Sequence, residues 1–120
     1  MKVAYWVVAG LLALFYLYAG GKKVAQSKET LAPMMAWVDT VPMPAVRVIG
    51  VVEILGAAGL VLPPLTGIAP ALAVAAAGGF VLLQVLATGL HLTRGEAKVI
   101  GLNLALIALA AAATWLATAF

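Results

Sequence analysis

Four long runs of apolar residues dominate the pattern of hydrophobic and polar positions along this chain. They cover residues 3–19, 45–62, 67–90 and 99–120. Each run is close to or above the ~20 residues that a helix needs to cross a hydrocarbon core of about 30 Å. None shows the polar–apolar alternation that is typical of the strands of a membrane barrel. The pattern therefore predicts an all-α polytopic membrane protein, a four-transmembrane-helix bundle that forms a single domain of residues 1–120.

Two of the three connections between the runs are short. Pro63 and Pro64 close the second run, and the uncharged segment from Pro63 to Thr66 predicts a tight antiparallel hairpin between the second and third helices. The third connection, residues 91–98, contains a histidine and several charged residues. Neither connection is long enough to hold a further domain.

The first connection, residues 20–44, is long enough for secondary structure of its own. Its apolar residues recur at the i, i+3, i+4 and i+7 positions of one helical face: Leu31, Met34, Met35 and Val38. Ser27 or Thr30 is a suitable N-cap for such a helix. With Trp37 at headgroup level, the segment predicts a short interfacial helix between the first two spans.

Composition supports the membrane assignment and excludes several kinds of chemistry. The 120 residues are 66% hydrophobic and 9% charged, with a mean hydropathy of +1.18, so there are too few charges to cover a soluble domain. The chain has no cysteine; by itself it cannot build a thiol–disulfide relay, an iron–sulfur cluster or a cysteine-ligated metal site. No intrinsic cofactor and no metal site are expected, and redox chemistry would need a bound cofactor or another subunit.

The basic residues predict the orientation of the chain. Only Lys2 lies on the side of the termini. The others all lie on the side of the first and third connections: Lys22, Lys23, Lys28, Arg47, Arg94 and Lys98. By the positive-inside rule, both termini are predicted to lie outside the cytoplasm. Because these residues flank spans, the net charge of +3 does not indicate a nucleic-acid partner.

Each of the four predicted spans contributes a polar side chain to the half nearest the first and third connections, whereas the opposite half has almost none beyond Thr114 and Thr118. At a rise of about 1.5 Å per residue, Glu53 lies about 13 Å deep, Gln84 about 10 Å, Tyr16 about 9 Å and Asn103 about 7 Å. Inserting a carboxylate to such a depth costs about 2.5–3.5 kcal/mol of free energy on insertion scales. Such a residue therefore normally has a binding partner or a functional role. The convergence predicts a polar pocket that opens toward the cytoplasmic side.

Glu53 is the centre of this predicted pocket. Gly50 and Ala57 share its helix face, so another helix can approach closely there. No lysine or arginine lies on the same face, and desolvation is therefore expected to keep the carboxyl group wholly or partly neutral at pH 7. In that state Glu53 would donate a hydrogen bond to Asn103, Gln84 or a ligand oxygen.

Two further residues complete the candidate ligand-binding set, His91 and Lys23. His91 extends the polar face of Gln84 and Thr88 toward the interface, where it could carry a proton. Lys23 could donate to a ligand oxygen, although as a residue of the interface it is expected to snorkel to the surface. A structural alternative stays open for the whole set: Glu53 and the amides would then serve to hold the helices in register.

Several motifs resemble those of a known family. They are Gly-Gly-Lys-Lys at residues 20–23, Val41-Pro42, the stretch Gly50–Pro63 around Glu53, the stretch His91–Glu96, and Asn103. Together they resemble the DoxX-like membrane proteins over essentially the whole chain, and the glutamate-centred stretch is the most specific part. The resemblance implies a small four-helix protein of the bacterial cytoplasmic (inner) membrane. It also implies a link to redox chemistry, since the family is named for a subunit of a quinone-linked thiosulfate-oxidising enzyme.

We therefore expect a redox-associated membrane subunit that binds a quinone-like or other lipophilic small molecule near Glu53. The chain holds no electron carrier, so a redox partner subunit would deliver the electrons. Two alternatives stay open: a small-molecule transporter or binder with Glu53 as counter-ion or proton carrier, and a purely structural membrane subunit. Catalytic residues are not indicated. Small-residue faces such as Gly78 and Gly79 allow a homo-oligomer without requiring one.

Overall fold

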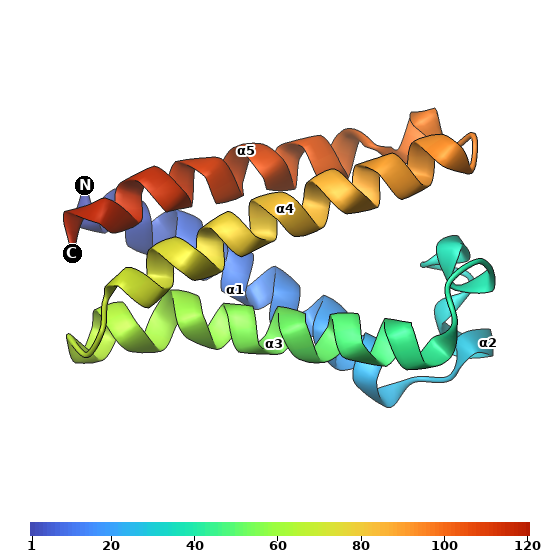
Figure 1. Ribbon diagram of the computed structural model, residues 1–120, viewed down its shortest axis with the longest axis horizontal. Helices are drawn as coiled ribbons and strands as arrows, with labels where there is room; N and C mark the ends of the chain where they lie inside the picture. Colours follow the sequence, from blue (N-terminus) through green and yellow to red (C-terminus); the bar gives the residue numbers. More distant parts are fainter.

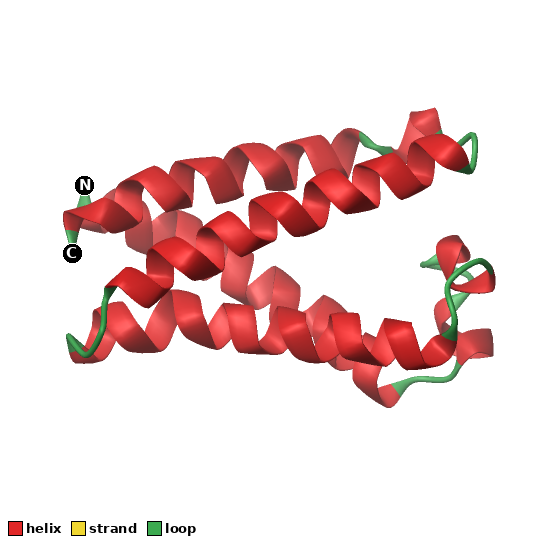
Figure 2. Ribbon diagram, viewed as in Figure 1, coloured by secondary structure: helices red, strands yellow, loops and turns green.

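The computed structural model of the chain is a bundle of helices (Figures 1 and 2). It describes residues 1–120, with the exception of the side chain of Val99. Four helices are long and apolar enough to cross a membrane. They are α1 (Lys2–Ala25), α3 (Met43–Thr66), α4 (Ala71–Thr93) and α5 (Gly101–Leu116), the last continued by the 3₁₀ helix η3 (Ala117–Ala119). The described residues form no strand, and the predicted all-α fold with four spans is confirmed.

The long helices are arranged as two pairs that diverge from one another. α1 packs mainly against α3, and α4 packs mainly against α5. Both termini and the turn between α3 and α4 lie at one end, from which α3 and α4 separate toward the other connections (Figure 1). We call these the terminal end and the loop end. At the terminal end the two ends of the chain meet, since the rings of Tyr5 and Phe120 lie 5.0 Å apart.

Small residues form the centre of the bundle. Ala9, Ala57, Ala77 and Ala110, one from each long helix, are each at most 1% exposed. Side chains of this size let helix backbones approach closely, which is how membrane helices gain packing energy without a hydrophobic force between them. Many leucines and valines instead face outward, where lipid would surround them.

The prediction that the prolines end the second span is wrong, because α3 continues through both of them. Pro64 has no N–H to donate to the carbonyl oxygen of Leu60, one turn earlier. The buried hydroxyl of Tyr5 on α1 donates to that oxygen instead, at 2.5 Å. Gly67, with φ of 73°, then ends the helix in the left-handed conformation that glycine adopts without strain. The turn to α4 therefore follows the prolines.

The first connection contains two short helices rather than the single predicted one. α2 (Lys28–Leu31) is capped by Ser27, whose side chain accepts from the N–H of Thr30, and the 3₁₀ helix η1 (Ala36–Asp39) follows after a turn. Pro33 lies in that turn and cannot donate to the helical ladder. The predicted apolar face is largely kept, since Leu31, Met35 and Val38 are buried while Met34 is exposed.

Other helix limits differ from the predicted spans in ways that affect the site. α1 runs to Ala25, past the predicted end at residue 19, so that Lys23 is a helical residue. α4 begins at Ala71, after a turn in which Gly67 and Ala69 have positive φ, rather than at residue 67. It ends at Thr93, which places His91 in its last turn.

Candidate functional site

The contact between α1 and α3 is unusually close near the loop end. A Cβ atom added to Gly20 would lie 2.7 Å from the carbonyl oxygen of Gly50, and one added to Gly50 would lie 2.8 Å from that of Gly20. Only glycine fits at both positions, and the two backbones therefore lie almost against each other. This contact determines what the next residues on each face can reach.

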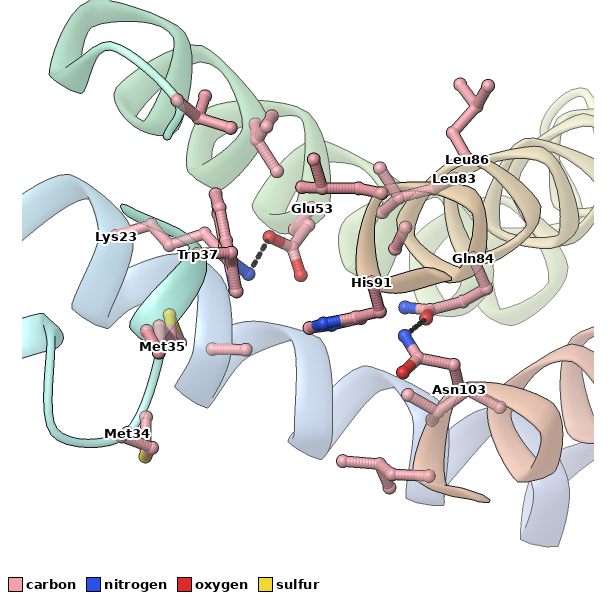
Figure 3. A pocket seen from close by; sticks show the side chains of 18 of the residues that line it. Lys23, Met34, Met35, Trp37, Glu53, Leu83, Gln84, Leu86, His91 and Asn103 are labelled. Atoms are coloured by element: carbon pink, nitrogen blue, oxygen red, sulfur yellow. Dashed lines mark hydrogen bonds and ion pairs between the residues drawn. The ribbon is translucent and has the colours of Figure 1, made fainter. Parts of the chain in front are cut away.

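The residues that follow on these two faces form a buried ion pair. Lys23 Nζ lies 2.5 Å from Glu53 Oε1, with side-chain exposures of 9% and 2% (Figure 3). The same Nζ lies 5.7 Å from the centre of the Trp37 ring, within the range of a cation–π contact. Both charged groups are thus held between α1, α3 and the first connection.

This pairing corrects two predictions. Glu53 does not face Asn103 or Gln84 as its hydrogen-bond partner, and Lys23 does not extend to the surface. The reason is the continuation of α1: Lys23 lies three residues after Gly20, on the face that meets α3. The expectation of a neutral Glu53 assumed that no cation was near, and that assumption does not hold.

A second buried polar cluster joins three helices. Gln84 Nε2 on α4 donates to the hydroxyl of Tyr16 on α1, and Asn103 Nδ2 on α5 donates to Gln84 Oε1, both at 2.8 Å. Tyr16 is fixed by stacking on Phe80, with ring centres 3.8 Å apart. The predicted convergence of polar residues is thus divided into an ion pair and an amide–tyrosine cluster.

A cavity of about 710 Å³ lies between the four long helices at the loop end. Five of the predicted site residues line it: Lys23, Glu53, Gln84, His91 and Asn103. Most of the remaining wall is apolar or aromatic, including Phe15, Trp37, Ile49, Leu83, Leu90 and Leu106. Tyr16 is fully buried behind Gln84 and is not among the described side chains that line the cavity. Figure 3 shows polar side chains from α1, α3, α4 and α5 turned toward this shared space.

A charged network connects the first and third connections at the loop end. Arg94 donates to Glu96 Oε1 at 2.8 Å and to Asp39 Oδ1 at 2.5 Å, and it also contacts Thr40. His91 Nδ1 lies 2.9 Å from the same Glu96 oxygen. Since His91 and Glu96 both line the cavity, the network forms part of its boundary.

Arg94 controls the electrostatics of this network. Its hydrogen bond lowers the pKa of the Glu96 carboxyl group, with a smaller contribution from His91. The hydrogen bond from Arg94 and then that from Thr40 also lower the pKa of Asp39. In return, the pKa of the Arg94 guanidinium is raised, first by Glu96 and then by Asp39. Both carboxylates are therefore ionised and can act only as hydrogen-bond acceptors.

Sequence reasoning did not identify Arg94, Glu96 and Asp39 as parts of the site. Their closeness in sequence to His91 could have indicated Arg94 and Glu96, because all three lie within the short third connection, residues 91–98. Asp39 gave no signal. It lies 55 residues from Arg94, and only the folded chain brings the two together.

Comparison with known proteins identifies the family to which the chain belongs. The sequence profile described as the DoxX-like family matches residues 7–113. The chain belongs to the DoxX-like family. Together with four apolar helices of spanning length, membership makes this DoxX-like chain a multi-pass integral membrane protein. Searches of curated proteins and of solved structures found no match.

Proposed function

We propose that this DoxX-like protein binds a quinone-like lipophilic ring in the cavity at the loop end, as a redox-associated membrane subunit. The observation that carries the proposal is a cavity between membrane-spanning helices that combines apolar walls with buried or half-buried polar groups from α1, α3, α4 and α5. Its volume of about 710 Å³ lies within the ~300–1,000 Å³ of typical small-molecule sites. A ligand with an apolar body and a few oxygen atoms suits such a lining.

The polar groups are suited to a ring that carries oxygen atoms. Lys23, His91 and the Gln84–Asn103 pair all line the cavity and can form hydrogen bonds with a ligand. Trp37 supplies an aromatic face beside them. With no cysteine in the chain, electrons would reach the ring from a partner subunit, and the ring itself would exchange with the surrounding lipid.

The orientation in the membrane belongs to the same proposal. We propose that the loop end faces the cytoplasm of a bacterial cell and that both termini lie outside it, as the basic residues of the connections indicate. Since the chain has no native cysteine, single cysteines at Ser27 and Thr118 report the topology directly. The cysteine at Thr118 should react with a membrane-impermeant maleimide added outside intact cells, and the cysteine at Ser27 should react only when the reagent reaches the cytoplasmic side. Labelling of both from the same side would contradict the orientation.

The structural alternative is favoured by one observation, the contact of Gly20 with Gly50. That contact and the adjacent Lys23–Glu53 pair would hold α1 against α3 even in a protein with no ligand. The counter-ion alternative has less support, because an external cation would have to displace Lys23 from Glu53. Experiments on ligand binding separate the structural alternative from the proposal.

Trp37 provides a probe of binding. In a variant with Trp6→Phe and Trp115→Phe, Trp37 is the remaining tryptophan. Titration of this variant in lipid nanodiscs with a decyl-benzoquinone should quench its fluorescence in a saturable manner. A matched variant that keeps Trp115 alone should show only the linear quenching of a quinone dissolved in lipid, because Trp115 is exposed and is not among the residues that line the cavity.

Substitutions within one helix test whether the quenching reports the cavity. Asn103→Leu on α5 should weaken saturable quenching several-fold, whereas Thr114→Val, toward the other end of the same helix, should leave it unchanged. Mass spectrometry of protein purified in mild detergent should also find a quinone retained with the native chain. If quenching by Trp37 is linear and no lipophilic ring is retained, the protein is not a quinone binder and the structural alternative stands.

A further inference from the structure

The hydrogen-bonding character of the cavity follows first from His91 and Glu96. The ionised Glu96 carboxylate can only accept, so the nitrogen that faces it, His91 Nδ1, carries the proton of the imidazole. In a neutral imidazole the other nitrogen, Nε2, then has a lone pair and no hydrogen. His91 lines the cavity, and in its neutral form it presents an acceptor there.

Asn103 presents a second acceptor. Gln84 Nε2 donates to the Tyr16 hydroxyl, and Gln84 Oε1 accepts from Asn103 Nδ2. The remaining oxygen, Asn103 Oδ1, has no hydrogen-bond partner among the described residues. Figure 3 shows it turned away from Gln84. The amide thus offers its carbonyl oxygen to the cavity.

Glu53 presents the third acceptor. Lys23 binds its Oε1, while the second carboxylate oxygen points away from the ammonium group (Figure 3) and has no hydrogen-bond partner among the described residues. The one cationic donor of the set, Lys23 Nζ, gives one of its three N–H groups to Glu53 and lies against the Trp37 ring. The polar wall therefore presents three acceptor atoms that only a ligand with a donor of its own can satisfy.

We infer that the cavity selects the hydroxyl-bearing, reduced form of its ring ligand, a quinol, over the quinone. A carbonyl oxygen can only accept and would leave the lone pairs of His91, Asn103 and Glu53 without donors. A hydroxyl group donates to these atoms and still accepts from Lys23. The inference rests on the proposed function and adds to it the chemical class that binds more tightly. Removal of a buried partner costs more than a hydrogen bond gains, which makes such selection effective.

Three probes that share a decyl-substituted six-membered ring with two para oxygens test the preference. They are 2-decyl-1,4-dihydroxybenzene, its dimethyl ether and 2-decyl-1,4-benzoquinone, titrated without oxygen at pH 8 into nanodiscs that contain the chain with Trp37 alone. The dimethyl ether keeps the oxygen acceptors but has no donor. The dihydroxy compound should bind at least about fivefold more tightly than both others, the equivalent of about one net hydrogen bond.

The outcomes separate this inference from the proposed function. If the quinone binds as tightly as the dihydroxy compound or more tightly, the inference is overturned while quinone-class binding stands. Equal affinity of the dihydroxy compound and its ether likewise contradicts selection by donors. Saturable binding by none of the three overturns the proposed function itself.

Glu96 acts as a positioning residue in this scheme, and its role can be measured without ligand. His91 is the one histidine of the chain, so ¹⁵N-histidine labelling gives an unambiguous spectrum of its two ring nitrogens. The native chain should show a protonated Nδ1 and an unprotonated Nε2 at pH 8. In Glu96→Ala the constraint on Nδ1 is lost, the proton should move at least partly to Nε2, and the preference for the dihydroxy probe should fall about threefold or more.

Matched variants complete the test. Glu29→Ala removes an exposed carboxylate from α2 and should change neither the nitrogen spectrum nor the preference. Asn103→Leu, in a chain with Glu96 intact, removes a different acceptor and should also lower the preference, which keeps the test valid if Glu96→Ala does not fold. An unprotonated Nδ1 in the native chain, or a preference unaffected by both Glu96→Ala and Asn103→Leu, would overturn the inference.

Discussion

The two ends of this bundle are built from the same four helices but are held together by different forces. At the terminal end, alanines and aromatic rings pack without a charged side chain in the core. At the loop end, where the α1–α3 pair and the α4–α5 pair diverge (Figure 1), the Gln84 cluster and the Arg94 network connect the two pairs, and the Lys23–Glu53 ion pair is buried between α1 and α3. The terminal end is thus a packed region, and the loop end is a polar frame around a cavity.

The comparison shows how a small membrane protein can form a cavity without losing its fold. Small residues let the helices approach closely where no ligand is needed. Where the helices separate, packing is lost, and hydrogen bonds between side chains across the gap have to replace it. The terminal end therefore supplies general stability, and the loop end supplies both local stability and chemistry.

The largest expected effect comes from breaking the ion pair at the loop end. Glu53→Leu leaves the Lys23 ammonium buried without its partner, and the free energy of unfolding should fall by about 3–5 kcal/mol. Lys23→Met combined with Glu53→Leu should recover most of that loss, since it removes both charges. Denaturation in mixed micelles of mild detergent and SDS measures both. A double variant no more stable than Glu53→Leu would show that the pair itself is required.

The glycine contact should give the next largest effect. Gly50→Ala places a methyl group 2.8 Å from the Gly20 oxygen and equally close to Lys23 Cβ, so α1 and α3 must separate, at a cost of about 1–3 kcal/mol. Gly10→Ala is the control, because a Cβ there meets nothing within 4 Å; it should be neutral or slightly stabilising. Equal losses from both would mean that glycine content, rather than this contact, matters.

The terminal end can be weakened selectively through Tyr5. Tyr5→Phe removes the donor to the Leu60 oxygen and should cost about 1–2 kcal/mol, which lies within the ~1–3 kcal/mol for a buried acceptor left unpaired. Pro64→Ala restores a backbone N–H that can donate to the same oxygen, so the cost of Tyr5→Phe should shrink in that background. A double-mutant cycle measures the coupling, and additive costs would contradict the role assigned to the hydroxyl. Binding at the loop end should not change.

The smallest expected effect is the pH dependence of the Arg94 network. Because the pKa values of Asp39 and Glu96 are lowered in the folded protein, their contribution is present above the ordinary carboxyl pKa of about 4 and is lost as pH falls through the lower folded values. Hydrogen exchange of residues 36–40 should therefore accelerate, relative to the intrinsic rate, below about pH 4. Arg94→Gln should remove this dependence, and an unchanged profile in that variant would exclude the network as its cause.

The spans could be predicted from the sequence because they depend on local hydropathy and length, which the chain carries in every window. Their ends could not, since they depend on partners. Pro64 predicts the end of a helix, because it leaves the Leu60 carbonyl oxygen without its backbone donor. Only the folded chain shows that the Tyr5 hydroxyl donates to this oxygen. Gly20 and the lysines after it read as a loop until α3 is known to lie against them.

The sequence predicted which residues line the cavity better than it predicted which of them bond to each other. Depth along each span grouped Glu53, Gln84, Tyr16 and Asn103 at one end, and all but Tyr16 line the same cavity, as does His91, which was added from the helical face of Gln84. Depth does not give rotation about the helix axis, however. The choice of Lys23 over Asn103 as the partner of Glu53 depends on that rotation and on the close contact between α1 and α3.

The meeting of the chain ends makes the fold almost a closed ring. Lys2 lies 5.3 Å over the ring of Phe120, so a short linker between the termini would join them with little disturbance. New ends could then be opened in the turn around Pro33, next to the cavity. Such a circular permutant would keep every helix and every membrane crossing. It would turn the wall of the cavity into a pair of free chain ends, to which a partner or a reporter could be fused directly at the site.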